Sequence, residues 1–243
     1  MDAIILAAGY ATRLYPLTEN PPKPLLKAAG KAIIEHILGK IAELGGIKKI
    51  YIVTNNKFAA NFEEWAKNFE SDFIVKIIND GTESNEDRLG AIGDMQHVIE
   101  KNSIDDDTIV IAGDNLFEFH LNGPMSLFRK KKSDVIVLYD VKDFELAKHY
   151  GVVEVKGGLL EKFEEKPAHP SSTLVSTGVY LFTRKTASLI KKYLEQGNNP
   201  DKSGSFVEWL HKREKVYAYI TDKRWYDIGS FEQLEKADRE FRG

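Results

Sequence analysis

The chain of 243 residues contains no cysteine, which excludes a disulfide framework, a thiolate zinc site and a cysteine nucleophile. A chain without cysteine suits a reducing compartment. No apolar run approaches the roughly 20 residues that span a bilayer. The apolar stretch 2–8 is short and has no basic segment before it. We therefore expect no signal peptide and a soluble, cytoplasmic protein without a membrane partner.

The sequence also lacks an excess of charge of one sign. Lys and Arg total 34 against 37 Asp and Glu, which leaves a formal net charge of −3. Nucleic-acid-binding proteins usually carry a strong basic excess, so we predict no nucleic-acid partner. The length suits one large α/β domain or two small ones, at roughly 100–200 residues per domain. No internal repeat is present, and in particular no hexapeptide repeat of a left-handed β-helix.

Short β-branched runs alternate with amphipathic stretches in the first half of the chain. This pattern implies parallel strands with helices on both faces of a sheet. Gly45 and Gly46 should end the first helix. We expect strands at residues 3–7, 49–54, 73–78, 108–112 and 135–139, and helices at 32–44, 58–69, 89–100 and 125–131.

The second half of the chain does not keep this regular alternation of strand-like and helix-like runs. Gly157 and Gly158 separate two strand-like runs, which indicates a hairpin. We expect strands at 151–155, 159–164, 174–182 and 216–220, and helices at 186–195, 206–213 and 230–241. The predicted fold is a single α/β domain that is Rossmann-like. Its central sheet is mixed and mostly parallel, with helices on both faces and a small antiparallel part in the second half.

The first expected strand opens into the loop LAAGYATRL, residues 6–14. Small residues after a strand let backbone N–H groups approach an anion closely. The loop matches neither the G-x-G-x-x-G dinucleotide pattern nor a P-loop. A plain tight turn is the alternative interpretation of this loop.

The segment TENPPKPL, residues 18–25, places Lys23 among three prolines. Proline restricts its own backbone and that of the preceding residue, so we expect Lys23 to be held in an extended conformation. A rigid cationic loop near a small-residue loop suggests phosphate binding. An ordinary surface turn with a solvated lysine is the alternative.

Asp114 follows the expected strand 108–112, at the strand end where open α/β sheets bind ligands. Its carboxylate suits Mg²⁺, which takes hard oxygen ligands beside substrate phosphates. An Asx turn is the alternative. The acidic run 105–107 precedes the same strand, so we expect it to be a solvated turn at the opposite edge. The motifs EEKP (164–167) and WYDIG (225–229, before Ser230 as a helix N-cap) are weaker signals, and no role is assigned to the six histidines.

Taken in order, these segments resemble the sugar-1-phosphate nucleotidylyltransferase family, which includes thymidylyl-, uridylyl-, cytidylyl- and guanylyltransferases. The resemblance runs from Ile4 to the last helix and is carried by the motifs LAAGxxTRL, PKPL, GDN, EEKP, STGVY and WxDxG. It implies Mg²⁺-dependent attack of a sugar 1-phosphate on the α-phosphorus of a nucleoside triphosphate. It also implies one nucleotidyltransferase domain over 1–243, with a mainly nucleotide-binding half (1–140) and a mainly sugar-phosphate-binding half (141–243), and no β-helix domain.

The resemblance further implies roles for individual residues. The catalytic set is Arg13, Lys23, Asp114, Lys166 and Asp227, with Asp114 and Asp227 as the two Mg²⁺ ligands. The nucleotide-binding set is Leu6, Ala8, Gly9, Arg13, Asn79, Leu89 and Gly90. The sugar-phosphate-binding set is Gly151, Glu165, Lys166, Thr177 and Gly178.

Two departures from the family pattern leave alternatives open. Many relatives have glycine where this chain has Ala11, and alanine tolerates positive φ poorly, so we expect this loop to be shaped differently. The base-reading segments of this chain are Asn79-Asp80-Gly81 and Asp87-Arg88-Leu89-Gly90-Ala91. Thymidylyltransferases commonly have Gln and Gly at the matching places, so dTTP, UTP and CTP all remain open as substrates. A phosphocholine acceptor, a non-catalytic regulatory paralogue, a glycosyltransferase and self-association into a homo-oligomer also remain open.

Overall fold

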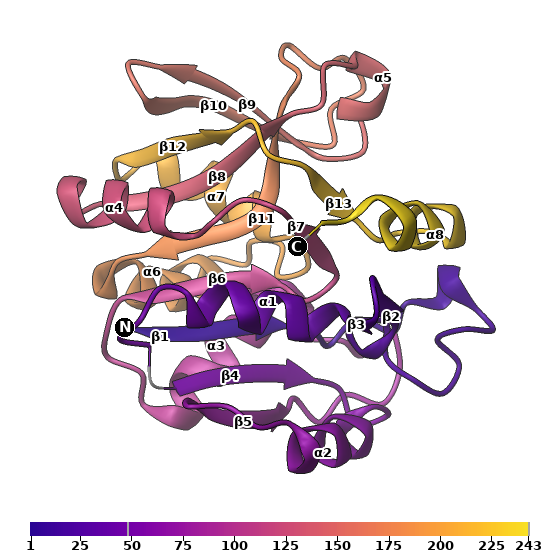
Figure 1. Ribbon diagram of the computed structural model, residues 1–243. Helices are drawn as coiled ribbons and strands as arrows, with labels where there is room; N and C mark the ends of the chain where they lie inside the picture. The colour runs from indigo at the N-terminus through magenta and orange to yellow at the C-terminus, as the bar shows by residue number, and fades with distance from the viewer. Residues whose placement is uncertain (48, 243) are drawn as a thin grey trace.

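The computed structural model describes residues 1–47 and 49–242, apart from the side chain of Arg13. Within these residues the central sheet has nine strands in the order β5-β4-β1-β6-β11-β8-β12-β10-β9 (Figure 1). They are β1 (Asp2–Leu6), β4 (Lys49–Thr54), β5 (Ile74–Asn79), β6 (Thr108–Ala112), β8 (Asp134–Asp140), β9 (Gly151–Lys156), β10 (Leu159–Glu165), β11 (Leu174–Phe182) and β12 (Val216–Thr221). Strands β5, β4, β1 and β6 are parallel, as are β8 and β12, whereas β11 and β10 run antiparallel to their neighbours. The predicted mixed α/β fold is confirmed.

Helices cover both faces of this sheet (Figure 1). In β1, Ala3 and Ile5 pack into one apolar cluster and Ile4 into another, because successive strand side chains point to opposite faces. The first cluster includes residues of α1 (Ile33–Ala42), α2 (Ala59–Asn68) and α4 (Asn122–Lys131). The second includes residues of α3 (Gly90–Asn102), α6 (Arg184–Glu195) and α7 (Ser203–His211). Among the described residues, no helix is long and apolar enough to cross a membrane.

The turn and cap signals in the sequence are confirmed. Gly45 and Gly46 take φ values of 60° and 75° just after α1 ends. Gly157 and Gly158 join β9 to β10 as an antiparallel hairpin. Ser230 caps α8 (Phe231–Glu240) by accepting a hydrogen bond from the Gln233 N–H.

Several short elements are additional to those expected from the sequence. They are β2 (Lys27–Ala28), β3 (Lys31–Ala32), β7 (Asn115–Phe117), β13 (Trp225–Asp227), α5 (Phe144–Ala147) and the 3-10 helices η1 (Thr12–Leu14) and η2 (Lys23–Leu25). Strands β7 and β13 pair antiparallel outside the main sheet, with Asp227 opposite Asn115. This pairing brings the end of the chain to the loop that follows β6.

The expectation of an extended Lys23 is wrong. Lys23 is the first residue of η2, and the extended conformation falls on Pro22 (φ −67°, ψ 149°). Two backbone hydrogen bonds close the turn, from Leu25 to the Pro22 carbonyl (2.9 Å) and from Leu26 to the Lys23 carbonyl (3.0 Å). These bonds outweigh the restriction that Pro24 places on the residue before it.

Candidate active site

A cleft of about 520 Å³ opens where β1 and β6 end. Carboxyl ends of parallel strands meet at one sheet edge, which is the usual position of ligand sites in open α/β folds. The cleft is lined by Leu6, Ala7, Ala8, Gly9, Tyr10, Ala11, Thr12, Lys23, Pro24, Asn85, Arg88, Gly90, Ala91, Asp94, Asp114 and Asp201. A larger groove of about 740 Å³ lies beside α1, but it contains none of the predicted site residues.

The loop after β1 presents backbone donors to this cleft. Its start is anchored, because the Ala8 carbonyl accepts a hydrogen bond from Asn55 Nδ2 at 2.8 Å. Among the described residues, the N–H groups of Gly9, Tyr10 and Ala11 have no acceptor. A Cβ on Gly9 would meet no atom within 4 Å, so glycine keeps space open beside these donors. Successive free N–H groups of this kind form anion-binding concavities.

Ala11 adopts the left-handed conformation (φ 48°, ψ 36°), although alanine tolerates positive φ poorly. Its carbonyl accepts hydrogen bonds from Thr18 Oγ1 (2.7 Å) and from the Leu14 N–H (3.0 Å). These two contacts hold a backbone conformation that costs a non-glycine residue about 1–2 kcal/mol. Arg13 follows in η1, but its side chain, and with it the predicted phosphate contact, lies outside the described residues.

Lys23 and Asp114 form an ion pair at the end of the cleft that also contains Pro24. Lys23 Nζ donates to Asp114 Oδ2 at 2.7 Å, and the two side chains are 13% and 36% exposed. The lysine comes from η2 and the carboxylate from the turn between β6 and β7, 91 residues apart. The structure thus brings together a predicted phosphate ligand and a predicted metal ligand.

Asp227 lies next to Asp114 through the pairing of β13 with β7. The Ile228 N–H donates to the Asp114 carbonyl at 3.2 Å, and Asp227 is opposite Asn115. Burial, and then the negative charge of Asp227, raise the pKa of Tyr150 to about 12. Within the described residues no group of three or more His, Asp or Glu side chains is arranged around a common metal position. Two carboxylates fit Mg²⁺, which often takes one or two from the protein and the remaining ligands from phosphates and water.

Glu165 occupies space that two glycines leave open. A Cβ on Gly204 would lie 2.0 Å from Glu165 Oε2, and one on Gly151 would lie 2.4 Å from Phe163 and 3.2 Å from Glu165 Oε2. Burial raises the pKa of Glu165, while Lys166 and Lys202 act in the opposite direction. Gly151 and Glu165 are therefore neighbours, and the glycine is also needed for packing against Phe163. Their place in a sugar-phosphate subsite stays a prediction.

Lys166 is exposed just beyond β10. Its backbone is left-handed (φ 52°), and its N–H donates to the Tyr150 carbonyl at 3.0 Å. The hydrogen bond from Arg88, followed by the charges of Arg88, Lys202 and Lys166, lowers the pKa of Asp201. Lys166 thus lies close enough to influence a carboxylate that lines the cleft.

Thr177 and Gly178 form an irregularity in β11 that positions Asn115. The register of β11 against β8 shifts between Ser176 and Tyr180. Asn115 Nδ2 donates to the Thr177 carbonyl, and a Cβ on Gly178 (φ 75°) would lie 2.9 Å from that nitrogen. The Thr177 hydroxyl donates to the Val137 carbonyl at 3.0 Å. Through Asn115, both residues support the turn that carries Asp114.

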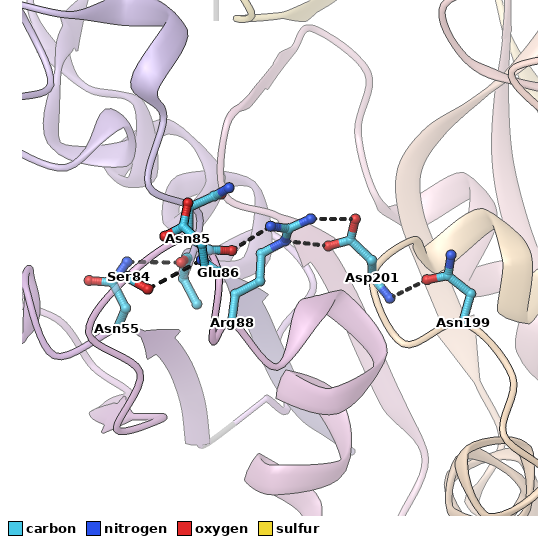
Figure 2. Close-up of polar contacts among 8 residues, drawn as sticks. Asn55, Ser84, Asn85, Glu86, Arg88, Asn199 and Asp201 are labelled. Carbon is cyan, nitrogen blue, oxygen red and sulfur yellow. Dashed lines mark hydrogen bonds and ion pairs between the residues drawn. The ribbon is translucent and has the colours of Figure 1, made fainter.

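The opposite end of the cleft is bridged by Arg88 and Asp201, which face each other in Figure 2. Arg88 Nε and Nη2 bind the two carboxylate oxygens of Asp201 at 2.8 and 3.1 Å. The Asp201 carbonyl accepts the Ala91 N–H (3.2 Å) at the start of α3. Gly90 (φ 77°) permits this approach, since its Cβ would lie 2.5 Å from Asp201 Cα. Sequence reasoning missed this pair, because its members are 113 residues apart.

Asn79 and Leu89 are not among the described residues that line the cleft. Asn79 Nδ2 donates to Asn56 Oδ1, and Asn79 Oδ1 accepts the Gly81 N–H, both at 2.9 Å. Leu89 is the N-cap residue of α3. Of the two residues in the predicted Leu89–Gly90 turn, the structure places Gly90 in the cleft.

Comparison with known proteins agrees with this fold. The family model "Nucleotidyl transferase" matches residues 2–242. The chain is 33% identical over 232 residues to the bifunctional protein GlmU of Methanocaldococcus jannaschii, covering 94% of this chain and 51% of that protein. It is 31% identical to the UTP–glucose-1-phosphate uridylyltransferase AglF of Haloferax volcanii, covering 75% of this chain and 72% of the relative.

A solved structure is also similar over the whole chain. It is that of a protein from Bacillus anthracis named as a candidate glucose-1-phosphate thymidylyltransferase, in complex with a sucrose. It matches with a TM-score of 0.86 and 25% identity, covering 100% of this chain and 97% of that one. The chain belongs to the nucleotidyl transferase family, and the family predicted from its motifs is confirmed. It spans about half the length of the GlmU relative.

Proposed function

We propose that the chain transfers a nucleotidyl group from a nucleoside triphosphate to a sugar 1-phosphate, forming a nucleoside-diphosphate sugar and pyrophosphate. The observation that carries this proposal is the Lys23–Asp114 ion pair in a cleft that also presents the free N–H groups of Gly9, Tyr10 and Ala11. The site therefore combines anion donors with a carboxylate suited to a metal. A relative named for UTP and glucose 1-phosphate supports a sugar phosphate as the acceptor.

The proposed reaction is a direct in-line displacement. An oxygen of the sugar phosphate attacks the α-phosphorus, and the bond from that phosphorus to the oxygen bridging to the β-phosphate breaks. Pyrophosphate leaves with that oxygen and its electron pair. The attacking phosphate is already ionised near pH 7, so the step needs neither a general base nor a covalent intermediate. The protein must chiefly align two polyanions and neutralise their charge.

The cleft residues divide this work. The N–H groups of Gly9 to Ala11 and the Arg13 guanidinium are assigned to the β- and γ-phosphates. Asp114 and Asp227 are assigned to Mg²⁺, which when bound would offset charge on the phosphates. With Asp114 holding the metal, the Lys23 ammonium would be free to bind an oxygen on the α-phosphate.

The acceptor is assigned to the second half of the chain. Lys166 would face the attacking phosphate, and Glu165 with Gly151 would border the sugar. Thr177 and Gly178 would contribute indirectly, because they hold Asn115 and so position the turn that carries Asp114. The cytoplasmic location and any self-association remain predictions.

Pyrophosphate release tests the proposal. Purified protein is incubated with each of UTP, dTTP, CTP, GTP and ATP against glucose 1-phosphate, mannose 1-phosphate and phosphocholine, with Mg²⁺ or with EDTA. We expect release with at least one sugar 1-phosphate and its loss in EDTA. Release with phosphocholine alone would overturn the acceptor assignment. Nucleotide binding without release from any pair would overturn catalysis and support the regulatory alternative.

A further inference from the structure

A buried acidic side chain lies at the end of the cleft formed by α3. Asp94 is one helical turn after Gly90 and Ala91, so it lies on their face of α3 and lines the cleft with them. Asp94 is only 5% exposed, and Met95 and Val98 of the same helix are buried in the apolar core. An isolated ionised carboxylate is very costly in such surroundings. Asp94 therefore needs a partner or a proton.

Its partner is a second carboxyl group, Asp80, which follows β5. Asp94 Oδ1 and Asp80 Oδ2 are both buried, and neither has an N–H or O–H donor from another group among the described residues. The two carboxyl groups instead lie within hydrogen-bonding reach of each other. Two carboxyl oxygens can hydrogen-bond only if one carries a proton. The pair is therefore a carboxylic acid bound to a carboxylate.

The surroundings indicate which group carries the proton. Asp80 Oδ1 accepts hydrogen bonds from the Thr82 N–H and hydroxyl, both at 2.8 Å. Because the Thr82 hydroxyl donates to Asp80, Tyr10 Oη must donate to Thr82 Oγ1 at 3.1 Å. Asp80 is therefore already supplied with hydrogen-bond donors by Thr82, so the proton within the pair is carried by Asp94. Asp94 has no such donors in the described structure; burial, then the charge and hydrogen bond of Asp80, then the charge of Asp201 raise its pKa to about 8.

Among the side chains that the structure describes, no nearby cation is available to replace that proton. Arg88, which precedes α3, is held by both carboxylate oxygens of Asp201 and by the Asn85 carbonyl. The other titratable groups near Asp94 are Asp80 after β5, Tyr10 after β1, Asp201 before α7 and His97 one turn further along α3. The neutral acid is thus the stable form of Asp94 at neutral pH. Its O–H is used by Asp80, which leaves Oδ2 as an uncharged acceptor on a residue that lines the cleft.

We propose that Asp94, as a neutral acid held by Asp80, accepts a hydrogen bond from an N–H on the Watson–Crick edge of the substrate nucleobase. This inference rests on the proposed function, because it requires a nucleoside triphosphate in the cleft. An uncharged acceptor suits this position since an ionised carboxylate would repel the triphosphate. Every standard base of an unmodified triphosphate carries such an N–H, so Asp94 would orient the base. Methylation of that N–H would remove the hydrogen bond to Asp94.

Calorimetric titration of the ligand-free enzyme with UTP, CTP, GTP and ATP, without acceptor, tests this role. The nucleotide that binds most tightly is then titrated at about pH 7 and about pH 9, on either side of the Asp94 pKa. We expect its Kd to rise about tenfold or more at the higher pH. The analogue methylated at the Watson–Crick N–H of that base should bind about tenfold more weakly at pH 7, as expected when a buried hydrogen bond is lost.

Asp94→Asn is the decisive variant. Asparagine donates its amide to Asp80 and keeps a carbonyl acceptor toward the cleft, so affinity at pH 7 should stay within about threefold of the wild type. The rise in nucleotide Kd between pH 7 and pH 9 should disappear in Asp94→Asn. Ionisation of the nucleotide itself would raise Kd equally in the wild type and in the variant, so it could not explain a difference between them. In Asp80→Asn the loss of nucleotide affinity should begin at lower pH, because the variant lacks the negative charge that keeps the proton on Asp94. Asp134→Asn, at a distant buried acid whose pKa burial raises to about 6, should leave the profile unchanged.

The inference fails if wild-type affinity is the same at both pH values, if Asp94→Asn keeps the weakening, or if the methylated analogue binds normally. In those cases nucleotide binding and turnover would persist, so the proposed function would stand. If no triphosphate binds the wild type at either pH, the proposed function fails and this inference fails with it.

Discussion

Lys23 Nζ lies 2.7 Å from Asp114 Oδ2, although the two residues come from segments 91 positions apart. The pair joins the first loop region to the turn after β6 at one end of the candidate cleft. In the proposed reaction both groups must change partner, the lysine to a phosphate and the carboxylate to a metal. The ion pair therefore represents a resting arrangement of the site.

Replacing Lys23 should separate metal binding from catalysis. In Lys23→Met, Asp114 loses its competing cation, so Mn²⁺ should bind the nucleotide-free enzyme about tenfold more tightly, equivalent to about 1.4 kcal/mol. Turnover should nevertheless fall by about 10²–10³, the cost of losing one group that stabilises transition-state charge. Electron paramagnetic resonance of free Mn²⁺ and pyrophosphate release measure the two effects. Lys27→Met, at an exposed position on β2, serves as the control. Unchanged Mn²⁺ affinity in Lys23→Met would contradict the competition.

Removing one charge from either proposed metal ligand should abolish most activity without unfolding the protein. We expect Asp114→Asn and Asp227→Asn each to lower turnover by about 10² or more, because a neutral amide binds Mg²⁺ poorly. Asp105→Asn makes the same change in an exposed acid beside Arg184, before β6, and should leave turnover intact. Thermal unfolding of all three variants checks the fold. Near-normal turnover of either site variant with Mg²⁺ would refute the metal assignment.

Lys166 should affect the acceptor and not the nucleotide. Lys166→Ala keeps a Cβ, so it leaves the left-handed backbone (φ 52°) under the same constraint. We expect KM for the sugar 1-phosphate to rise about tenfold or more, in line with the loss of one charged hydrogen bond. KM for the nucleotide should change little. Lys162→Ala, which removes an exposed lysine of β10, is the matched control. Unchanged acceptor kinetics would remove Lys166 from the acceptor site.

Ala11→Gly should stabilise the protein. Ala11 has φ 48° and Ala29 has φ 49°, and a left-handed alanine costs about 1–2 kcal/mol relative to glycine, less the extra chain entropy that glycine loses on folding. Each glycine variant should therefore gain up to about 1 kcal/mol in the free energy of unfolding, measured with urea. Only Ala11→Gly should alter KM for the nucleotide, because Ala11 lines the cleft and Ala29 does not. A loss of stability in Ala11→Gly would show that other contacts favour alanine there.

Gly90 and Gly81 make a matched test of close backbone approach. Both have positive φ, 77° and 84°, but a Cβ on Gly90 would lie 2.5 Å from Asp201 Cα, whereas one on Gly81 would meet nothing within 4 Å. Gly81→Ala should cost about 1–2 kcal/mol, the conformational term alone. Gly90→Ala should cost more and should displace the Arg88–Asp201 bridge. If Gly90→Ala and Gly81→Ala lost equal stability in urea unfolding, the backbone at Asp201 would have to move away from the new Cβ at little cost.

Much of the fold could be read from local patterns. The predicted ranges 49–54, 108–112 and 174–182 coincide with β4, β6 and β11, since each is a run of apolar and β-branched residues that a buried strand requires. The strand β13 was beyond such reasoning. Three residues carry too little periodicity, and Trp225–Asp227 is a strand only because Asn115–Phe117 lies beside it.

The candidate site divides in the same way. Lys23 and Asp114 were singled out by their neighbours in the chain, the three prolines and the preceding strand. Arg88 and Asp94 were not, because their importance depends on Asp201 and Asp80, which lie far from them in sequence. An aspartate on the buried face of α3, among Ile92, Met95 and Val98, was the local signal available for Asp94.

The absence of cysteine, of strong net charge and of long apolar runs, together with the ordered motifs, determined from sequence alone the class of fold and the residues on which phosphate chemistry could depend. These are properties of composition and of neighbours along the chain. The tertiary structure decided which of those residues meet: Lys23 with Asp114, Asp114 beside Asp227, and Asp94 with Asp80. Distances between residues far apart in sequence arise only when the sheet is assembled, and it is those distances that decide where a charge, a proton or a metal can be held.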